Sequence, residues 1–72
     1  MGNFDWFTFF KKCRINEFYA LQYAYIFMRH DIDETTIDKI QKEDFVYMGI
    51  KYVGHILKIL RYIKEMKKDT KM

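Results

Sequence analysis

The 72-residue chain contains no proline and no serine, and Cys13 is its one cysteine. A single cysteine cannot form an internal disulfide or supply a cysteine-based zinc site, and it favours a reducing, intracellular and cytoplasmic location. Without serine there is no serine nucleophile, and the three glycines form no phosphate-binding loop. The two histidines lack metal-ligand spacing. These absences predict no enzyme, no metal site and no cofactor.

Long hydrophobic runs are also missing. The longest apolar stretch, residues 18–28, is interrupted by Gln22 and is too short to cross a bilayer, so no membrane span is predicted. Half of the chain is nevertheless hydrophobic and 19% is aromatic, which is enough material for a core. At this length the sequence predicts one domain over residues 1–72, ordered at about 4–68, with a frayed basic tail.

Charge is distributed unevenly along the chain. Residues 1–30 carry a net charge of +2, residues 31–50 a net charge of −4, and residues 51–72 a net charge of +5. The acids of the middle segment are Asp31, Asp33, Glu34, Asp38, Glu43 and Asp44. An acidic middle and a basic end within one chain indicate two surfaces of opposite charge.

Every segment has the spacing of a helix, and the pattern predicts five. Asp5 caps a short first helix, and Asn16 caps a second with apolar positions at Phe18, Leu21, Ala24 and Phe27. A very short third helix holds Ile37 and Ile40, capped by Asp33 or Thr35, and a fourth spans 41–48 and is closed by Gly49. The last and longest runs from about Gly54 to about Lys68, with Ile56, Ile59, Leu60, Ile63 and Met66 on one face.

The positions that we expect to be buried follow from these helical faces. They are Trp6, Phe10, Phe27, Ile32, Ile37, Ile40, Phe45, Ile50, Ile59, Leu60 and Ile63. The aromatic residues Trp6, Phe7, Phe10, Phe18 and Phe27 are interpreted as core, with a nucleic-acid stacking platform as the alternative.

The stretch HDIDETTIDKIQKEDFVYMGIKYVGHILKIL resembles the second half of a sterile alpha motif (SAM) domain. The matching positions are Ile32-Asp33, Ile37, Ile40, Glu43-Asp44-Phe45, Gly49-Ile50, Gly54-His55 and Ile59-Leu60, without a gap, and Trp6 and Phe27 also fit. The resemblance implies an all-α, compact five-helix SAM-type bundle with a long C-terminal helix. Two departures touch variable surfaces: Ile56 replaces a common Arg or Lys, and the second helix is about one turn longer than usual.

The resemblance also implies a protein–protein interaction module that associates with another SAM domain, in homo- or hetero-oligomers, through two surfaces. The end-helix surface comprises Lys51, Tyr52, Val53, Gly54, His55 and Lys58. The mid-loop surface comprises Asp31, Asp33, Glu34, Asp38, Glu43 and Asp44. An open helix start suits partner carboxylates. Such a module is expected in a larger signalling or scaffold protein, for example a kinase.

Simpler interpretations remain open for the same residues. The glycines can serve only the backbone, by a positive dihedral at Gly49 and a close approach at Gly54. The acids can be ordinary helix caps, and His55 can be a packing residue. A second functional class is RNA-hairpin binding by the basic last helix, through Lys58, Arg61, Lys64, Lys67 and Lys68. The lysine-rich tail can contact an anionic membrane surface or simply be solvated.

Overall fold

The computed structural model describes residues 4–70, which form four α-helices, one turn of 3-10 helix and no strand. The helices are α1 (Trp6–Lys12), α2 (Glu17–Arg29), α3 (Lys42–Met48) and α4 (Val53–Thr70), and the 3-10 turn is η1 (Ile37–Lys39). The prediction of five helices is wrong at the third. The chain returns to an extended conformation at Ile40, with φ −71° and ψ 144°, so the segment ends after one turn.

The helix ends follow the predicted chemistry. The Asp5 carboxylate accepts a hydrogen bond of 3.1 Å from the backbone N–H of Thr8, and the Asn16 side chain accepts one of 2.7 Å from Phe18. Gly49 ends α3 with φ 95°, a left-handed conformation in which a side chain would be strained. The predicted caps of α1 and α2 and the glycine at the end of α3 are confirmed.

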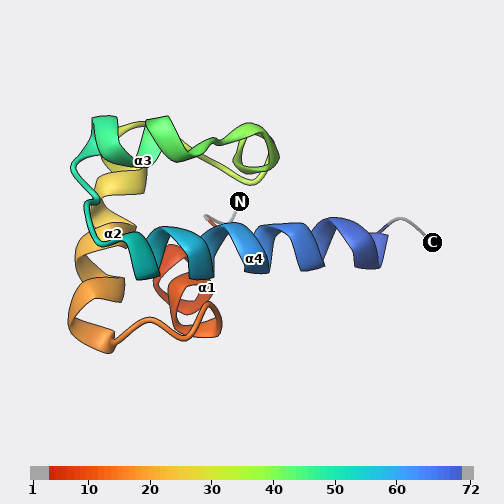
Figure 1. Cartoon of the computed structure of the whole chain (residues 1–72), viewed down its shortest axis with the longest axis horizontal. Coiled ribbons are helices and arrows are strands. Elements are labelled where there is room, and N and C mark those ends of the chain that lie inside the picture. The colour runs from red at the N-terminus through yellow and green to blue at the C-terminus, as the bar shows by residue number, and fades with distance from the viewer. Residues whose placement is uncertain (1–3, 71–72) are drawn as a thin grey trace.

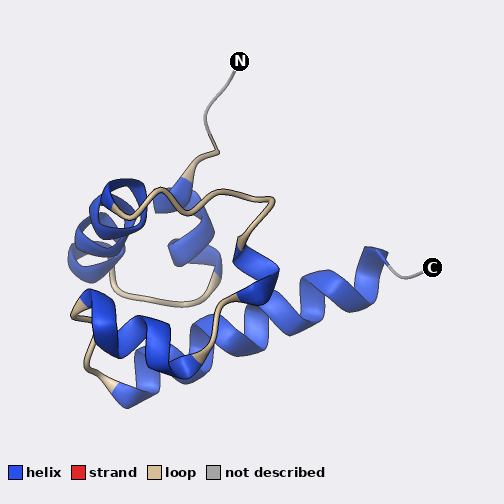
Figure 2. Cartoon of the chain, turned by 90° about the horizontal axis from the view of Figure 1, so that it is seen from above, coloured by secondary structure: helices blue, strands red, loops and turns tan. Residues whose placement is uncertain are grey.

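Helix α4 is the long axis of the molecule, and the other elements gather around its N-terminal part. Its C-terminal turns extend beyond them in both views (Figures 1 and 2). Helix α4 begins one residue before the predicted Gly54 and continues two residues beyond Lys68. Of the tail expected to fray, residues 71 and 72 lie outside the described residues.

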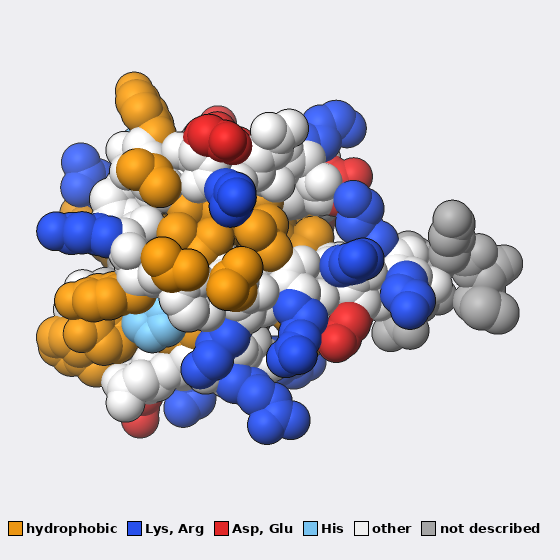
Figure 3. All heavy atoms as spheres, viewed as in Figure 1, with side chains coloured by type: hydrophobic (Ala, Val, Ile, Leu, Met, Phe, Trp, Pro, Cys, Tyr) orange, Lys and Arg blue, Asp and Glu red, His pale blue; other side chains and the backbone are white. Residues whose placement is uncertain are grey.

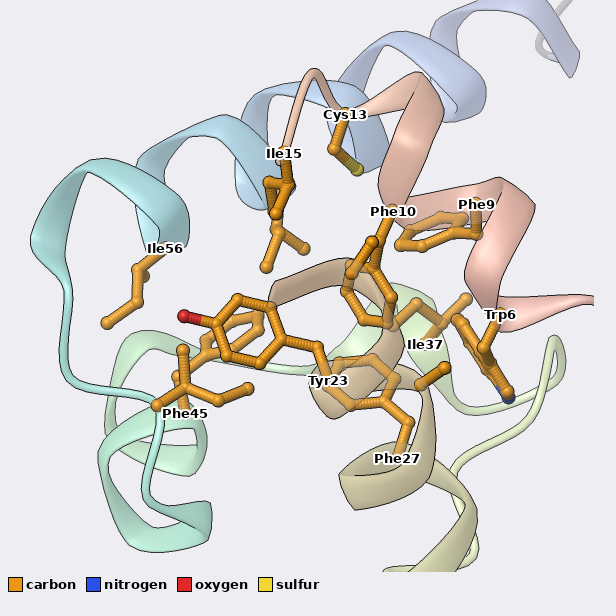
Figure 4. Packing of buried hydrophobic residues seen from close by; sticks show 14 of the residues in the cluster. Trp6, Phe9, Phe10, Cys13, Ile15, Tyr23, Phe27, Ile37, Phe45 and Ile56 are labelled. Carbon is orange, nitrogen blue, oxygen red and sulfur yellow. The ribbon is translucent and has the colours of Figure 1, made fainter. Parts of the chain in front are cut away.

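The core is largely aromatic. The rings of Trp6 and Phe10 on α1 each lie 4.9 Å from that of Phe27 on α2, in edge-to-face arrangements. Phe45 on α3 and Ile59 on α4 close the cluster, and both are fully buried. Figure 4 shows these aromatic rings meeting between the helices. Edge-to-face pairs add about 0.5–1.5 kcal/mol each to the hydrophobic burial.

Most of the predicted core is confirmed. Ile32, Ile40 and Leu60 are only partly buried, as is Phe7. Seven further positions are buried, of which only Ala24 and Ile56 lie on apolar faces that the spacing predicts: Phe9, Cys13, Ile15, Ala20, Tyr23, Ala24 and Ile56. Ile56 stands where a basic residue is common in the resembling family, and here it lies 5% exposed. The substitution therefore extends the core at the start of α4.

Helix α2 corrects two predictions. Phe18 and Leu21 were expected on its buried face, yet they are 63% and 64% exposed. A step of three residues turns back about 60° around a helix, so the predicted series from Phe18 to Phe27 crosses from one side to the other. The buried face is instead Ala20, Tyr23, Ala24 and Phe27.

Candidate functional site

The start of α4 lies open on the surface. Helix α4 follows Tyr52, whose phenol cannot cap the first backbone N–H groups as Asp, Asn, Ser or Thr does. Tyr52 and Val53 are 54% and 67% exposed, and Lys51 is exposed beside them. The positive end of a long helix dipole therefore faces solvent between apolar side chains and a lysine.

Gly54 has no packing role within the described chain. A Cβ added at this position would meet no atom within 4 Å, so the expected close approach inside the domain is wrong. Gly54 instead leaves the first turn of α4 bare. Because glycine has no Cβ, the backbone of a bound partner can come closer to this turn than it could if any other residue stood at position 54.

His55 is the packed member of the end-helix surface. The hydroxyl of Tyr23 and the Nδ1 of His55 share a hydrogen bond of 2.6 Å, and the ring of Tyr19 lies 5.0 Å from that of His55. Burial, with a smaller contribution from the positive charge of Lys58, lowers the pKa of His55 below 6.5. Burial also raises the pKa of Tyr23 to about 12, so its hydroxyl stays protonated at neutral pH. The imidazole is neutral at neutral pH and anchors the start of α4 to α2.

This histidine makes stability depend on pH. The unfolded chain, with the higher histidine pKa, binds the proton first, so the free energy of unfolding should fall as pH drops through about 6.5. We expect a falling melting temperature in circular dichroism between about pH 7.5 and 5.5. His55→Gln should flatten this dependence, whereas His30→Gln, at an exposed position, should keep it. A melting temperature that stays level or rises on acidification would contradict the assignment.

Lys58 is shared between the surface and the fold. Its Nζ donates a hydrogen bond of 3.2 Å to the backbone carbonyl of Arg14, a residue with φ 70° in the α1–α2 connection. A hollow of about 280 Å³ lies here, lined by Lys12, Cys13, Arg14, Lys58, Arg61, Tyr62 and Glu65. Four of these side chains are cations and one is an acid, so the hollow carries positive potential.

Cys13 is not a reactive group of this hollow. The side chain is 4% exposed, and burial raises the pKa of its thiol to about 12. A thiol with this pKa stays protonated at neutral pH and is a poor nucleophile.

The mid-loop acids divide into two groups. Asp33 accepts hydrogen bonds from the backbone N–H and the hydroxyl of Thr35, and Asp44 accepts one of 2.9 Å from the backbone N–H of Gln41. The bonds from Thr35 lower the pKa of Asp33 and hold the turn before η1. The N-cap of η1 is Thr36, without a side-chain hydrogen bond, so the prediction of Asp33 or Thr35 as this cap is wrong. Asp44 completes the capping box of α3 with Gln41. The remaining acids are Asp31, Glu34, Asp38 and Glu43, which are exposed and whose carboxylates bond to no residue in the described range. The capping interpretation therefore holds for part of the set only.

The two predicted surfaces meet at one place and diverge elsewhere. Glu43 of the mid-loop surface and Val53 of the end-helix surface line a common hollow. The segment before α3, with Asp31, Glu34 and Asp38, lies away from the start of α4 (Figure 1).

Lys67 fixes η1 against the C-terminal part of α4 by a hydrogen bond of 3.3 Å to the carbonyl of Asp38. Figure 3 shows Lys and Arg side chains along α4 and hydrophobic ones gathered at its start. One partner molecule can therefore meet the acids of residues 31–38 while another meets the start of α4.

An apolar hollow beside the start of α4 escaped the sequence analysis. It measures about 270 Å³ and is lined by Lys42, Glu43, Val46, Val53, Ile56 and Leu57. Val46 and Leu57 are 66% and 55% exposed. Both are apolar residues outside the predicted buried faces of their helices, and this sequence feature could have indicated the hollow. The hollow adds apolar area to the exposed start of α4.

Among residues 4–70, no helix is long and apolar enough to cross a membrane. In the same range no three His, Cys, Asp or Glu side chains are grouped so that they could hold a metal ion.

Comparison with known proteins identifies similar segments in much longer chains. The chain is 37% identical over 70 residues to the actin cytoskeleton-regulatory complex protein sla1 of Sclerotinia sclerotiorum, covering 94% of this chain and 6% of that protein. It is 35% identical over 48 residues to diacylglycerol kinase eta of Mus musculus, covering 67% of this chain and 4% of that protein. No solved structure matches significantly.

A family model gives the most direct result. The model of the SAM domain (sterile alpha motif) matches residues 15–67, which include α2, η1, α3 and most of α4. The match contains the open start of α4 and all the mid-loop acids. The chain therefore belongs to the SAM domain family.

Proposed function

We propose that this domain joins head to tail with another SAM domain, in its own or a different protein, through the end-helix and mid-loop surfaces. SAM domains are protein-interaction modules. The observation that supports this mode is the start of α4: an uncapped helix end with a bare Gly54, flanked by exposed Val53 and Lys51. Acids of a second copy suit the amide groups and lysine, and the apolar hollow supplies buried area.

The two surfaces are different, so their pairing is heterologous. A heterologous contact continues from copy to copy and forms an open filament unless its rotation closes a ring. If the partner is a different SAM domain, the same surfaces give a closed pair instead. Both similar proteins are far longer than this chain, and we infer that the domain serves as a module of a larger intracellular scaffold or signalling protein.

Sedimentation velocity over a concentration series tests self-association. We expect the average sedimentation coefficient to rise with concentration, and to rise less at high salt because salt screens the lysine–acid pairs. Lys58→Glu alone should weaken association only modestly, since an exposed pair contributes at most about 1 kcal/mol. A wild-type chain that stays monomeric at high concentration under both salts would rule out self-assembly and leave a different SAM partner as the proposal.

RNA-hairpin binding is the second candidate, and the basic hollow between α1 and α4 favours it. Lys12, Arg14, Lys58 and Arg61 could contact phosphates there. A hairpin added to the same sedimentation runs distinguishes the two functions. We expect weak, salt-sensitive binding that does not depend on the loop sequence. Sub-micromolar binding that discriminates between loops at physiological salt would place RNA first.

A further inference from the structure

The solvent side of α2 carries an apolar stripe. This α2 face consists of Phe18, Leu21, Tyr25 and Met28, which are 63%, 64%, 62% and 65% exposed. Successive members are three, four and three residues apart, so all four lie within about 80° of the helix circumference. Hydrophobic side chains also gather at this end of the molecule in Figure 3. A continuous apolar stripe on a small domain indicates a contact surface.

The α2 face has an internal symmetry. Its midpoint is position 23. Phe18 and Met28 each lie five residues from this position, and Leu21 and Tyr25 each lie two residues from it. Tyr23 itself points away from the stripe into the core and is 4% exposed. Glu17 and Arg29, the first and last residues of α2, lie six residues before and after the same midpoint. An acid and a base therefore flank the stripe symmetrically.

We propose that the α2 face binds the α2 face of a second copy of this chain, with the two helices antiparallel about a two-fold axis at position 23. Such an axis brings each residue of one copy to the level of the residue that lies equally far on the other side of the midpoint in the second copy. The resulting apolar layers are Phe18 with Met28 and Leu21 with Tyr25, and each layer occurs twice.

Symmetry and area both support a second copy as the occupant. The apolar positions repeat at equal distances on both sides of position 23, so an antiparallel second copy covers each member of the stripe with another member. Glu17 and Arg29 lie on opposite edges of the stripe and do not meet in such a pair. The four apolar side chains expose roughly 500 Å² in all, at about 200 Å² for each whole residue. A two-fold contact then buries about 1,000 Å², the lower limit for a specific interface, so we expect a dissociation constant of about 10 μM to 1 mM.

This contact lies close to the end-helix surface but is distinct from it. The ring of Phe18 is 5.2 Å from that of Tyr19, which is 5.4 Å from that of Tyr52. Leu21 and Tyr25 lie further along α2. The test therefore uses these distant positions and starts from the Lys51→Glu/Lys58→Glu variant, in which head-to-tail association is suppressed.

Sedimentation equilibrium of that variant up to about 1 mM should show a monomer–dimer equilibrium that does not proceed to larger species. Adding Leu21→Lys, next to the axis, should weaken the dimer at least about tenfold, because two lysines would be desolvated against apolar side chains. Tyr47→Lys is the matched control: Tyr47 is an 84% exposed aromatic residue on α3, and its change should leave the dimer unaltered.

The Leu21–Tyr25 layer gives a sharper test. Leu21→Glu and Tyr25→Lys should each weaken the dimer at least about tenfold, because each desolvates two charges against apolar side chains. An equimolar mixture of these two variants should form a heterodimer, since the introduced carboxylate and ammonium face each other in one layer while Leu21 faces Tyr25 in the other. Circular dichroism at low concentration checks that each variant remains folded.

Three outcomes would overturn the proposal. The parent variant could remain monomeric at about 1 mM, in which case the α2 face meets another segment or another protein. The dimer could persist with Leu21→Lys and so use a different surface. The mixture of Leu21→Glu and Tyr25→Lys could form no heterodimer, in which case the helices do not pair antiparallel about position 23.

Discussion

Phe27→Ala is expected to lower the free energy of unfolding by about 3–5 kcal/mol, a large part of the total for a domain of this size. Phe27 is fully buried, with the rings of Trp6 and Phe10 4.9 Å away and that of Phe45 6.2 Å away. Its removal leaves a cavity between three helices, since its neighbours belong to separate elements and relax only partly. Urea titration followed by circular dichroism measures the change.

Phe18→Ala is the matched control for this prediction. It removes the same side chain from the same helix, but at a position 63% exposed. We expect a change within about 0.5 kcal/mol when the protein is dilute and monomeric. Similar losses for the two variants would mean that the buried face of α2 has been assigned wrongly.

Mixing two variants with complementary defects should produce the second large effect. Lys51→Glu/Lys58→Glu damages the end-helix surface, and Asp38→Lys/Glu43→Lys damages the mid-loop surface. If the wild type forms filaments, each variant alone should stay monomeric at concentrations below those of the α2 dimer, because every head-to-tail contact needs both surfaces. An equimolar mixture should form a pair through the two intact surfaces, with recovery of at least about tenfold in affinity.

Controls for the mixture follow from the structure. Lys58 also bonds to the carbonyl of Arg14, so thermal unfolding must show that the Lys58 variant keeps its fold. Asp38 and Glu43 bond through their carboxylates to no described residue, so their change should leave the fold intact. A mixture no larger than its components, from a wild type that assembles, would show that the surfaces have been misplaced.

Local chemistry made much of this domain predictable. Asp5, Asn16 and Gly49 mark helix ends because capping depends on a few adjacent residues. The segment around Ile37 was harder, since one turn of 3-10 helix has the same spacing of three as a short α-helix. In the structure the backbone is extended at Ile40, so the segment ends as one turn of 3-10 helix.

Helix α2 shows where sequence reasoning stops. It has two apolar faces, one of Ala20, Tyr23, Ala24 and Phe27 and one of Phe18, Leu21, Tyr25 and Met28. Periodicity identifies both, but the face that becomes core is decided by the other helices. The same limit applies to the end-helix surface. The exposure of Gly54 and Leu57 depends on tertiary packing, whereas their helix was evident from spacing.

The symmetry of α2 has a consequence for the assembled state. A module with only a head-to-tail pair of surfaces has a valence of two and grows as a line. A self-complementary third surface on α2 would turn each copy into a potential branch point. Chains of such modules would cross-link side by side above a threshold concentration, because multivalent contacts reinforce one another. Weak dimerisation through four exposed side chains would then decide whether the assembly consists of separate linear filaments or of a cross-linked network.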